Sequence, residues 1–364
     1  MNSIDIIAGA RPNFVKIGPI IHAIKRHNLK SGSSPIKYRL IHTGQHYDSK
    51  MSGSFFEQLN IPAPDLNLEV GSGTQAYQTG QIMLRYEEAL SETRPDLCLV
   101  VGDVTSTMSC AIVAKKYGMK VGHVEGGIRS RDLRMPEEIN RLVTDSITDY
   151  FFTTTEQAGK NLLSEGKSES QILFVGNTMI DSLFANLSRL REPEILKRDN
   201  IDSGTYLVAT LHRPSNVDSA KNLSVLLSLI NENSGGKKII FPMHPRTRKV
   251  FETLSQSFDD IVVTEPMEYL QFIYLIKNSA GVITDSGGIT EETTVLNIPC
   301  ITLRDSTERP ETVTLGTNEL VGTDPANIVP YLVKMSSGQW KKGSKIRLWD
   351  GHTADRIVEH LVVL

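Results

Sequence analysis

Short apolar runs alternate with helix-length segments along nearly the whole 364-residue chain, and this alternation restricts the possible folds most strongly. Many runs are apolar throughout rather than at every second position, which is typical of strands covered by helices on both faces. The runs lie at 4–8, 38–42, 97–101, 122–124, 150–153, 172–175, 206–210, 238–242, 261–263, 281–284, 300–303 and 319–321. Segments with helical spacing lie between them, for example at 14–26, 107–116, 137–146 and 269–278. This order predicts parallel sheets with right-handed crossovers.

A polar stretch at 191–204 divides the series in two. We therefore expect an α/β protein with two doubly wound, Rossmann-like parallel-sheet domains that face a cleft. The first domain is predicted at 1–176 and the second at 177–352, and the helical segment 353–364 is predicted to pack back on the first. Ligands of such sheets bind beyond the carboxyl ends of the strands, so residues just after each strand are the first functional candidates.

Charge and cysteine usage limit the partners and the compartment. The chain has 39 Lys and Arg residues against 42 Asp and Glu residues, so bulk charge does not favour nucleic acid or an anionic membrane. No apolar run approaches the roughly 20 residues that span a bilayer, and the first residues lack the basic region of a signal peptide. The three cysteines, Cys98, Cys110 and Cys300, form no CxxC pair. We expect them to be reduced and buried in a cytoplasmic protein.

The clearest ligand signal follows the run at 281–284, where Ser286, Gly287 and Gly288 precede a helical segment that carries Glu292. Two glycines let backbone N–H groups approach a ligand, and a helix N-terminus favours a phosphate or pyrophosphate. Glu292 could then accept hydrogen bonds from a ribose diol. The alternative is an ordinary helix cap with solvated glutamates.

A second phosphate signal lies at the end of the first run, where Arg11 and Lys16 could hold phosphate oxygens or form a solvated surface pair. The glycine fingerprint of dinucleotide-binding folds is missing there. The segment 71–76 matches G-x-G-x-x-A without a βαβ unit around it, and we interpret it as a loop and helix cap. No nicotinamide cofactor is therefore expected.

Carboxylates follow successive strands of the first predicted domain. Asp103 follows 97–101, Glu125 follows 122–124, and Glu137 opens a helical segment that also carries Arg141. A structural role explains two of them equally well, because Asp103 could cap a loop and Glu137 could stabilise a helix N-terminus. Glu125, beside two glycines, has no such capping role. Acids that converge on one sheet edge indicate acid–base catalysis.

The second predicted domain places His212 and Arg213 after 206–210, and His244 after 238–242. The histidines lack the tight spacing of metal ligands and have no cysteine nearby, so no metal is expected. A sugar or phosphate facing these side chains and Arg309 is the preferred interpretation, although isolated charged residues in loops are usually solvated.

Nine segments together resemble the family of non-hydrolysing UDP-N-acetylglucosamine 2-epimerases, in consistent order over most of the chain. They are GARPNFVKIGPI, HTGQHYD, VVGDVTSTM, HVEGGIRS, MPEEINR, VGNTMIDSL, HRPSN, TDSGGITEE and LRDSTERPE. The resemblance implies the two-domain GT-B-type fold that one class of nucleotide-sugar glycosyltransferases shares. The catalytic residues it implies are Asp103, Glu125, Glu137 and His212. The substrate-binding residues it implies are Arg11, Lys16 and Arg141, with Ser286, Gly287, Gly288 and Glu292 at UDP.

The resemblance implies inversion of C2 of UDP-N-acetylglucosamine to UDP-N-acetylmannosamine, through UDP elimination to a glycal and re-addition, for surface polysaccharide precursors. It implies a homodimer that uses no metal or nicotinamide.

Pro214 and Ser215 depart from the His-Arg-Arg-Glu-Asn of many bacterial members, and the loop at 45–48 differs as well. Those segments serve an activating second substrate site in some members, so the departures argue against activation here. They leave open another acetamido sugar, such as a 2,3-diacetamido uronic acid. A hydrolysing epimerase, a glycosyltransferase and a non-catalytic nucleotide-sugar sensor are the other hypotheses.

Overall fold

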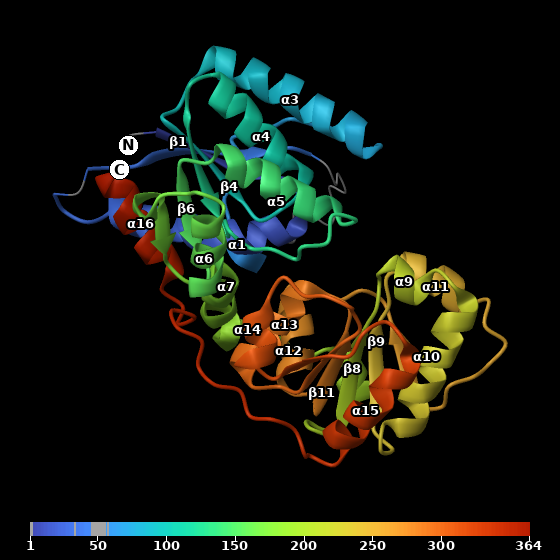
Figure 1. Cartoon of the computed structure of the whole chain (residues 1–364). Coiled ribbons are helices and arrows are strands. Elements are labelled where there is room, and N and C mark those ends of the chain that lie inside the picture. Colours follow the sequence, from blue (N-terminus) through green and yellow to red (C-terminus); the bar gives the residue numbers. More distant parts are fainter. Residues whose placement is uncertain (1–2, 33, 45–55, 57) are drawn as a thin grey trace. The chain divides into compact units, whose positions relative to one another are not determined.

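A computed structural model describes residues 3–32, 34–44, 56 and 58–364 of the chain. The chain divides into two compact units. Unit 1 comprises Met1–Ala185 together with Arg347–Leu364, and unit 2 comprises Asn186–Ile346. Each unit is built around its own parallel sheet with helices packed on it (Figure 1). The predicted fold class, two Rossmann-like parallel-sheet domains, is thereby confirmed.

Unit 1 contains a seven-stranded sheet with the strand order β3-β2-β1-β4-β5-β6-β7, and its pairings are parallel. The strands are β1 (Ser3–Ala8), β2 (Lys37–His42), β3 (Leu66–Asn67), β4 (Leu97–Val101), β5 (Lys120–Val124), β6 (Tyr150–Thr153) and β7 (Ile172–Phe174). Every run predicted in this part of the chain is a strand. The sequence pattern missed β3, because two residues are too few to produce a periodicity.

The helices of unit 1 cover both faces of this sheet. They are α1 (Arg11–Asn28), α3 (Gln75–Glu92), α4 (Thr105–Lys116), α5 (Pro136–Ile147), α6 (Glu156–Ser164), the short 3₁₀ helix η1 (Glu169–Gln171), α7 (Thr178–Asn186) and α16 (Thr353–Val363). Helices α3, α4 and α5 lie side by side on one face, and α1 and α16 pack against each other on the other (Figure 1). The segment 71–76 is a loop and cap as predicted, because Thr74 accepts a hydrogen bond from the Tyr77 N–H at the start of α3.

The register of the sheet brings the ends of its central strands together. Ile6 of β1 lies beside Leu99 of β4, and Val101 at the end of β4 lies beside Val124 at the end of β5. The loops that follow these three strands therefore leave the sheet at the same edge, which is where the predicted acids lie.

Unit 2 contains a six-stranded parallel sheet with the order β10-β9-β8-β11-β12-β13. Its strands are β8 (Tyr206–Thr210), β9 (Lys238–Pro242), β10 (Ile261–Thr264), β11 (Gly281–Thr284), β12 (Cys300–Thr302) and β13 (Asn318–Leu320). Its α-helices are α8 (Glu194–Arg198), α9 (Pro214–Val217), α10 (Ala220–Asn233), α11 (Pro245–Phe251), α12 (Tyr269–Lys277), α13 (Gly287–Leu296), α14 (Pro310–Thr314) and α15 (Val329–Ser336). Two 3₁₀ helices, η2 (Leu187–Arg189) and η3 (Pro325–Ile328), complete it.

The three cysteines are reduced and buried, as predicted. Within the part of the chain that the structure describes, no helix has the length and apolar character needed to cross a membrane.

The structure sets the boundary between the units after Ala185, later than the predicted break after Gly176. The reason is the packing of α7, whose Ser182 hydroxyl donates to the Val15 carbonyl of α1. The chain also returns to unit 1 at Arg347, earlier than predicted, and the Trp349 indole N–H donates to the Thr154 carbonyl at 3.1 Å. Helix α7 and the segment before α16 thus belong to unit 1.

Asp181 of α7 holds the start of α16 in unit 1. Its carboxylate accepts hydrogen bonds from the buried N–H groups of Thr353 at 3.1 Å and Ala354 at 2.7 Å. Asp181→Ala leaves both donors without this partner, so we expect it to lower the free energy of urea-induced unfolding by about 2 kcal/mol. Asp355→Ala is the matched control, because it removes only partly exposed contacts with Arg26 and His352 and should change stability by less than about 1 kcal/mol. Equal losses in the two variants would show that the cap does not hold α16.

Candidate active site

Lys16 and Glu125 form an ion pair at the sheet edge of unit 1. The Lys16 Nζ lies 2.7 Å from the Glu125 Oε2, and the Glu125 side chain is only 4% exposed. Glu125 adopts a left-handed backbone conformation with φ of 72°, which is uncommon for a residue with a side chain. Its N–H donates to the Phe152 carbonyl of β6, which keeps this turn against the sheet. Backbone strain of this kind is typical of functional sites.

Asn13 ties the loop before α1 to the same sheet edge. Its side-chain oxygen accepts the N–H groups of Gly9 at 3.0 Å and Ala10 at 2.9 Å, and its amide donates to the Val101 carbonyl at 3.0 Å. Lys16 lies one turn further along the helix, so Asn13 fixes the helix that carries the lysine to the strand that precedes Asp103. Arg11 begins this helix, and its side chain lies outside the described part of the structure.

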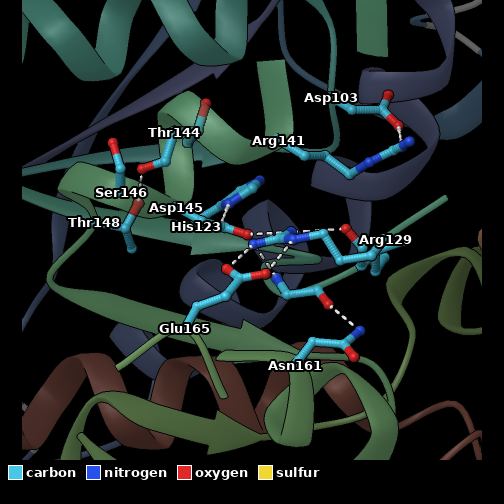
Figure 2. Close-up of polar contacts among 12 residues, drawn as sticks. Asp103, His123, Arg129, Arg141, Thr144, Asp145, Ser146, Thr148, Asn161 and Glu165 are labelled. Atoms are coloured by element: carbon cyan, nitrogen blue, oxygen red, sulfur yellow. Dashed lines mark hydrogen bonds and ion pairs between the residues drawn. The ribbon is translucent and has the colours of Figure 1, made fainter. Parts of the chain in front are cut away.

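Asp103 is partly exposed and is held by two residues of α5 (Figure 2). Its carboxylate forms an ion pair with the buried Arg141 guanidinium, and its backbone carbonyl accepts the Asn140 side-chain N–H at 2.8 Å. The predicted substrate-binding residue Arg141 thus contacts a predicted catalytic acid. An acid whose backbone and side chain are both fixed has little freedom to turn away from a substrate.

Glu137 and Glu138 have opposite surroundings although they are neighbours. Glu137 is exposed in the first turn of α5, whereas Glu138 is buried and accepts the N–H groups of Ser130 and Arg131, each at 2.9 Å. Burial alone would raise the pKa of Glu138, but these hydrogen bonds and the Arg141 charge outweigh it and lower the pKa. Glu138 therefore clamps the loop after β5 as a carboxylate, and Glu137 stays available at the surface.

Unit 1 also contains a buried network of charged side chains around His123 (Figure 2). The ring of His123, on β5, contacts the Asp145 carboxylate at 2.6 Å and the Gly102 carbonyl at 2.8 Å. Asp145 also accepts the Arg129 guanidinium at 2.7 Å, and Arg129 in turn binds Glu165 through two hydrogen bonds. Burial would raise the pKa of Asp145, but the charges and hydrogen bonds of His123 and Arg129 lower it.

His212 of unit 2 is oriented by Asp285, which follows β11. The His212 Nδ1 lies 2.9 Å from the Asp285 carboxylate, and the His212 N–H and Arg213 N–H also donate to that carboxylate. Burial would raise the pKa of Asp285, but its hydrogen bonds from His212, Asn216 and Arg213 lower it. Since Asp285 takes the Nδ1 side, the Nε2 of the half-exposed ring is left to accept or donate a proton.

The start of α13 presents backbone N–H groups, as the Ser-Gly-Gly sequence predicts. Ser286 precedes the helix, and a Cβ on Gly287 would come within 3.0 Å of Glu308 and 3.2 Å of Arg304. A Cβ on Gly288 would meet nothing within 4 Å. The space beside Gly288 is therefore open, whereas a side chain at Gly287 would crowd the ends of the Glu308 and Arg304 side chains.

The two adjacent glutamates of α13 are both buried, contrary to the solvated alternative. Glu291 forms an ion pair with Arg309, so the predicted substrate residue Arg309 contacts a carboxylate of its own unit. Glu292 accepts the Tyr269 hydroxyl at 3.1 Å. Burial raises the pKa of Glu292 from 4.5 to about 8, and the Glu291 charge adds to this while the Tyr269 hydrogen bond opposes it.

The remaining predicted residues have local roles or lie outside the described structure. His244 caps α11 by accepting the Arg246 N–H at 3.2 Å, and the Arg213 Nε donates to the Asp285 carbonyl at 3.1 Å. The loop at 45–48 lies outside the described residues. In residues 3–32, 34–44, 56 and 58–364, no group of three His, Cys, Asp or Glu side chains is placed to hold a metal ion.

The sequence prediction missed the residues that hold the acids rather than the acids themselves. His123, Asp145 and Asp285 were not candidates, although the sequence carries a signal for two of them. His123 lies in an apolar strand two residues before Glu125, and positions two apart point to the same face of a strand. Asp285 directly follows a strand at the sheet edge where ligands bind. Asp145 lies within a helix, where nothing in the local pattern marks it.

The fold and these residues define a two-domain α/β protein, with carboxylates at the sheet edge of one unit and a glycine-rich helix start in the other. Comparison with known proteins specifies the family. A profile described as UDP-N-acetylglucosamine 2-epimerase matches residues 29–362, and the chain belongs to this family.

Relatives cover nearly the whole chain. A UDP-N-acetylglucosamine 2-epimerase of Methanocaldococcus jannaschii is 41% identical over 369 residues, which is 98% of each chain. The crystal structure of the M. jannaschii enzyme with UDP-GlcNAc and UDP has a TM-score of 0.87, with both chains fully covered. A UDP-2,3-diacetamido-2,3-dideoxy-D-glucuronate 2-epimerase of Pseudomonas aeruginosa is 37% identical over 361 residues, 98% of this chain and 99% of the relative. A lipopolysaccharide outer core galactosyltransferase, 14% identical with a TM-score of 0.56, shares the fold.

The raised pKa of Glu292 makes stability depend on pH. Between about pH 4.5 and 8 the folded protein keeps the Glu292 proton while the unfolded chain has lost it, so stability falls as pH rises through this window. Glu292→Gln removes this contribution, so between pH 5.5 and 7.5 the wild type should lose about 2 kcal/mol more unfolding free energy than the variant. Urea unfolding at several pH values measures the difference.

Tyr269→Phe is the matched control for this prediction. It removes the hydrogen bond that opposes the pKa rise, so the decline in stability should extend above pH 8. Parallel pH profiles for the wild type and Glu292→Gln would contradict the assignment of a neutral buried carboxyl.

Proposed function

We propose that the protein inverts C2 of UDP-N-acetylglucosamine to give UDP-N-acetylmannosamine, without release of free sugar, for surface polysaccharide precursors. The observation that carries the proposal is the Lys16–Glu125 ion pair at the sheet edge next to Asp103. It occurs in a chain 41% identical over nearly its whole length to UDP-N-acetylglucosamine 2-epimerases. A sensor that only bound the nucleotide sugar would have no use for such groups.

The chemistry explains why paired acids are needed. C2 of the sugar has no neighbouring carbonyl, so its proton becomes removable only as the C1–O bond to UDP breaks. A base takes the C2 proton, the C–H electron pair forms the C1–C2 double bond, and the C–O pair leaves with UDP. Proton return to the opposite face of the glycal, followed by re-addition of UDP at C1, gives the epimer. The cycle needs a base, an acid and stabilisation of the leaving pyrophosphate.

Unit 1 would supply the proton transfers. Glu125 is suited to act as the base, because the Lys16 ammonium favours its charged form. Asp103, fixed by α5, and the exposed Glu137 are the candidates for the second proton transfer on the other face of the ring. We infer that Arg11 and Lys16 also face the phosphates, as the family resemblance implies.

Unit 2 would bind UDP. The open backbone at Gly288 suits the pyrophosphate, and Glu292 suits the ribose diol as a hydrogen-bond partner. His212, oriented by Asp285, would exchange a proton with the departing phosphate oxygen. The mechanism thus assigns proton transfer at the sugar to the first unit and most of the UDP contacts to the second.

A second substrate is favoured by a specific observation. The 37% identical P. aeruginosa relative acts, by its name, on a UDP-diacetamido uronic acid. The same elimination and re-addition would invert C2 of that sugar. The homodimer and the cytoplasmic location stay predictions, the first of which sedimentation in solution would test.

Proton NMR of the reaction in deuterated water tests the proposed function. The purified protein is incubated with UDP-N-acetylglucosamine, and with a panel of other UDP-acetamido sugars. We expect an equilibrium mixture of two UDP-sugars, both deuterated at C2. Free N-acetylmannosamine as the main product would instead identify a hydrolysing enzyme. Absence of C2 exchange with every sugar, despite UDP binding, would identify a sensor.

Glu125→Gln tests the assignment of the base. The amide keeps the size of the side chain but cannot take a proton, so C2 deuterium exchange should fall by at least about 100-fold. UDP should still bind in calorimetry, because the contacts assigned to unit 2 are unchanged. Glu92→Gln, an exposed position at the end of α3, is the matched control and should keep full exchange. Full exchange in Glu125→Gln would remove this residue from the mechanism.

A further inference from the structure

His123 is buried in the middle of unit 1, in a strand whose other positions are mostly apolar. Its side chain has no exposed surface, and neither the family resemblance nor the proton-transfer scheme gives it a role. A buried histidine with only a packing role would have a hydrogen-bond partner on one ring nitrogen and van der Waals contacts on the other. His123 instead has an oxygen at hydrogen-bond distance from each ring nitrogen: an Asp145 oxygen lies 2.6 Å from Nδ1 (Figure 2), and the Gly102 carbonyl lies 2.8 Å from Nε2.

Both of these oxygens accept hydrogen bonds. The Gly102 carbonyl has no proton to give, so the His123 Nε2 must donate to it. The partner of Nδ1 is the carboxylate of Asp145, whose second oxygen already accepts the Gly127 N–H at 3.0 Å and the Arg129 guanidinium at 2.7 Å. Donors of this number and charge keep a carboxylate ionised. Each nitrogen of the His123 ring therefore faces an oxygen that accepts hydrogen bonds.

The charges around the ring balance. Asp145 reaches it from α5, and Arg129 reaches Asp145 from the loop after β5. Glu165, at the end of α6, pairs with Arg129. With the ring protonated, two cations face two anions, which is the arrangement that a buried ionic cluster needs. In the chain His123 precedes Glu125, which directly follows the strand and pairs with Lys16, by two positions.

The bond from His123 holds a residue that both acids depend on. Gly102 has φ of 69°, and its N–H donates to the Val124 carbonyl at 3.0 Å while His123 holds its own carbonyl. A Cβ on Gly102 would come within 3.2 Å of the Lys16 Nζ and 3.9 Å of the Glu125 Oε2. Gly102 is thus in contact with the ion pair on one side and leads directly into Asp103 on the other.

We propose that His123 is a positioning residue for epimerisation: its two N–H groups tie the Gly102 carbonyl to the Asp145 carboxylate and so fix the spacing of Asp103 and Glu125. The inference rests on the proposed function, because it assumes that these two acids serve one reaction. Helix α5 supplies the anchor Asp145 as well as Asn140 and Arg141, which hold Asp103 from its other side. A displacement on the order of 1 Å between reacting groups can reduce a rate about 100-fold.

Two amide substitutions separate the two bonds of the ring. Glutamine places its side-chain N–H where the histidine Nε2 lies, so His123→Gln keeps a donor for the Gly102 carbonyl. Asparagine matches the Nδ1 position, so His123→Asn keeps a donor for Asp145 and loses Gly102. We expect kcat for C2 exchange to fall less than about 10-fold in His123→Gln and about 100-fold or more in His123→Asn. KM, and calorimetric Kd for UDP, should stay within about threefold of wild type in both.

Equal kcat losses in the two variants, or a larger loss in His123→Gln, would overturn the proposal. Such a result is expected if His123 serves only as a hydrogen-bond partner of Asp145. A change confined to KM would also overturn it. Nitrogen-15 NMR of histidine-labelled wild-type protein gives an independent test and needs no substrate. Two protonated ring nitrogens support the proposal, and a single one overturns it even if a variant fails to fold. Wild-type protein without C2 exchange would reject the proposed function, whereas the NMR result would still decide the state of the ring.

Discussion

Unit 1 depends on a helix that turns polar side chains inward. The buried residues of α5 are Glu138, Asn140, Arg141, Thr144 and Asp145, so its interior face carries the groups that usually face water. Polar groups in such a position are stable only where each finds a partner. The partners here are the loop after β5, the residue Asp103 and the ring of His123. Helix α5 is therefore a fixed template against which the two loops with the acids are set.

Unit 2 uses the same principle with different residues. Asp285 is buried at the end of β11, and backbone N–H groups of the loop after β8 converge on it together with the Asn216 amide. A buried carboxylate thus organises the neighbouring loop and orients His212. Glu292 is buried in a different way. Its hydrogen-bond partner is the Tyr269 hydroxyl, and burial raises its pKa. The pKa of Asp285 is thereby lowered and that of Glu292 raised, although both carboxyls are buried.

The strands and the candidate acids could be predicted from the sequence, but the residues that hold those acids in place could not. Apolar runs and turn residues are local signals, so the strands and the candidates Asp103 and Glu125 could be predicted. The residue pattern alone could not show which of Glu137 and Glu138 is buried, because Arg141 follows them at four and three positions and so suits both as a partner on a helix. His123 and Asp145 are 22 positions apart, and only the packing of α5 against β5 brings them together.

The position of α16 in the chain, after all of unit 2, has a consequence for how unit 1 folds during synthesis. Unit 1 begins at the N-terminus, yet Asp181 and α1 receive their last partner from residues that follow all of unit 2. During synthesis from the N-terminus, unit 2 is therefore complete in sequence before unit 1 is. The nascent first unit must wait with one face of α1 uncovered while about 160 further residues emerge and fold. The closure of unit 1 by α16 therefore follows the synthesis of unit 2 and does not precede it.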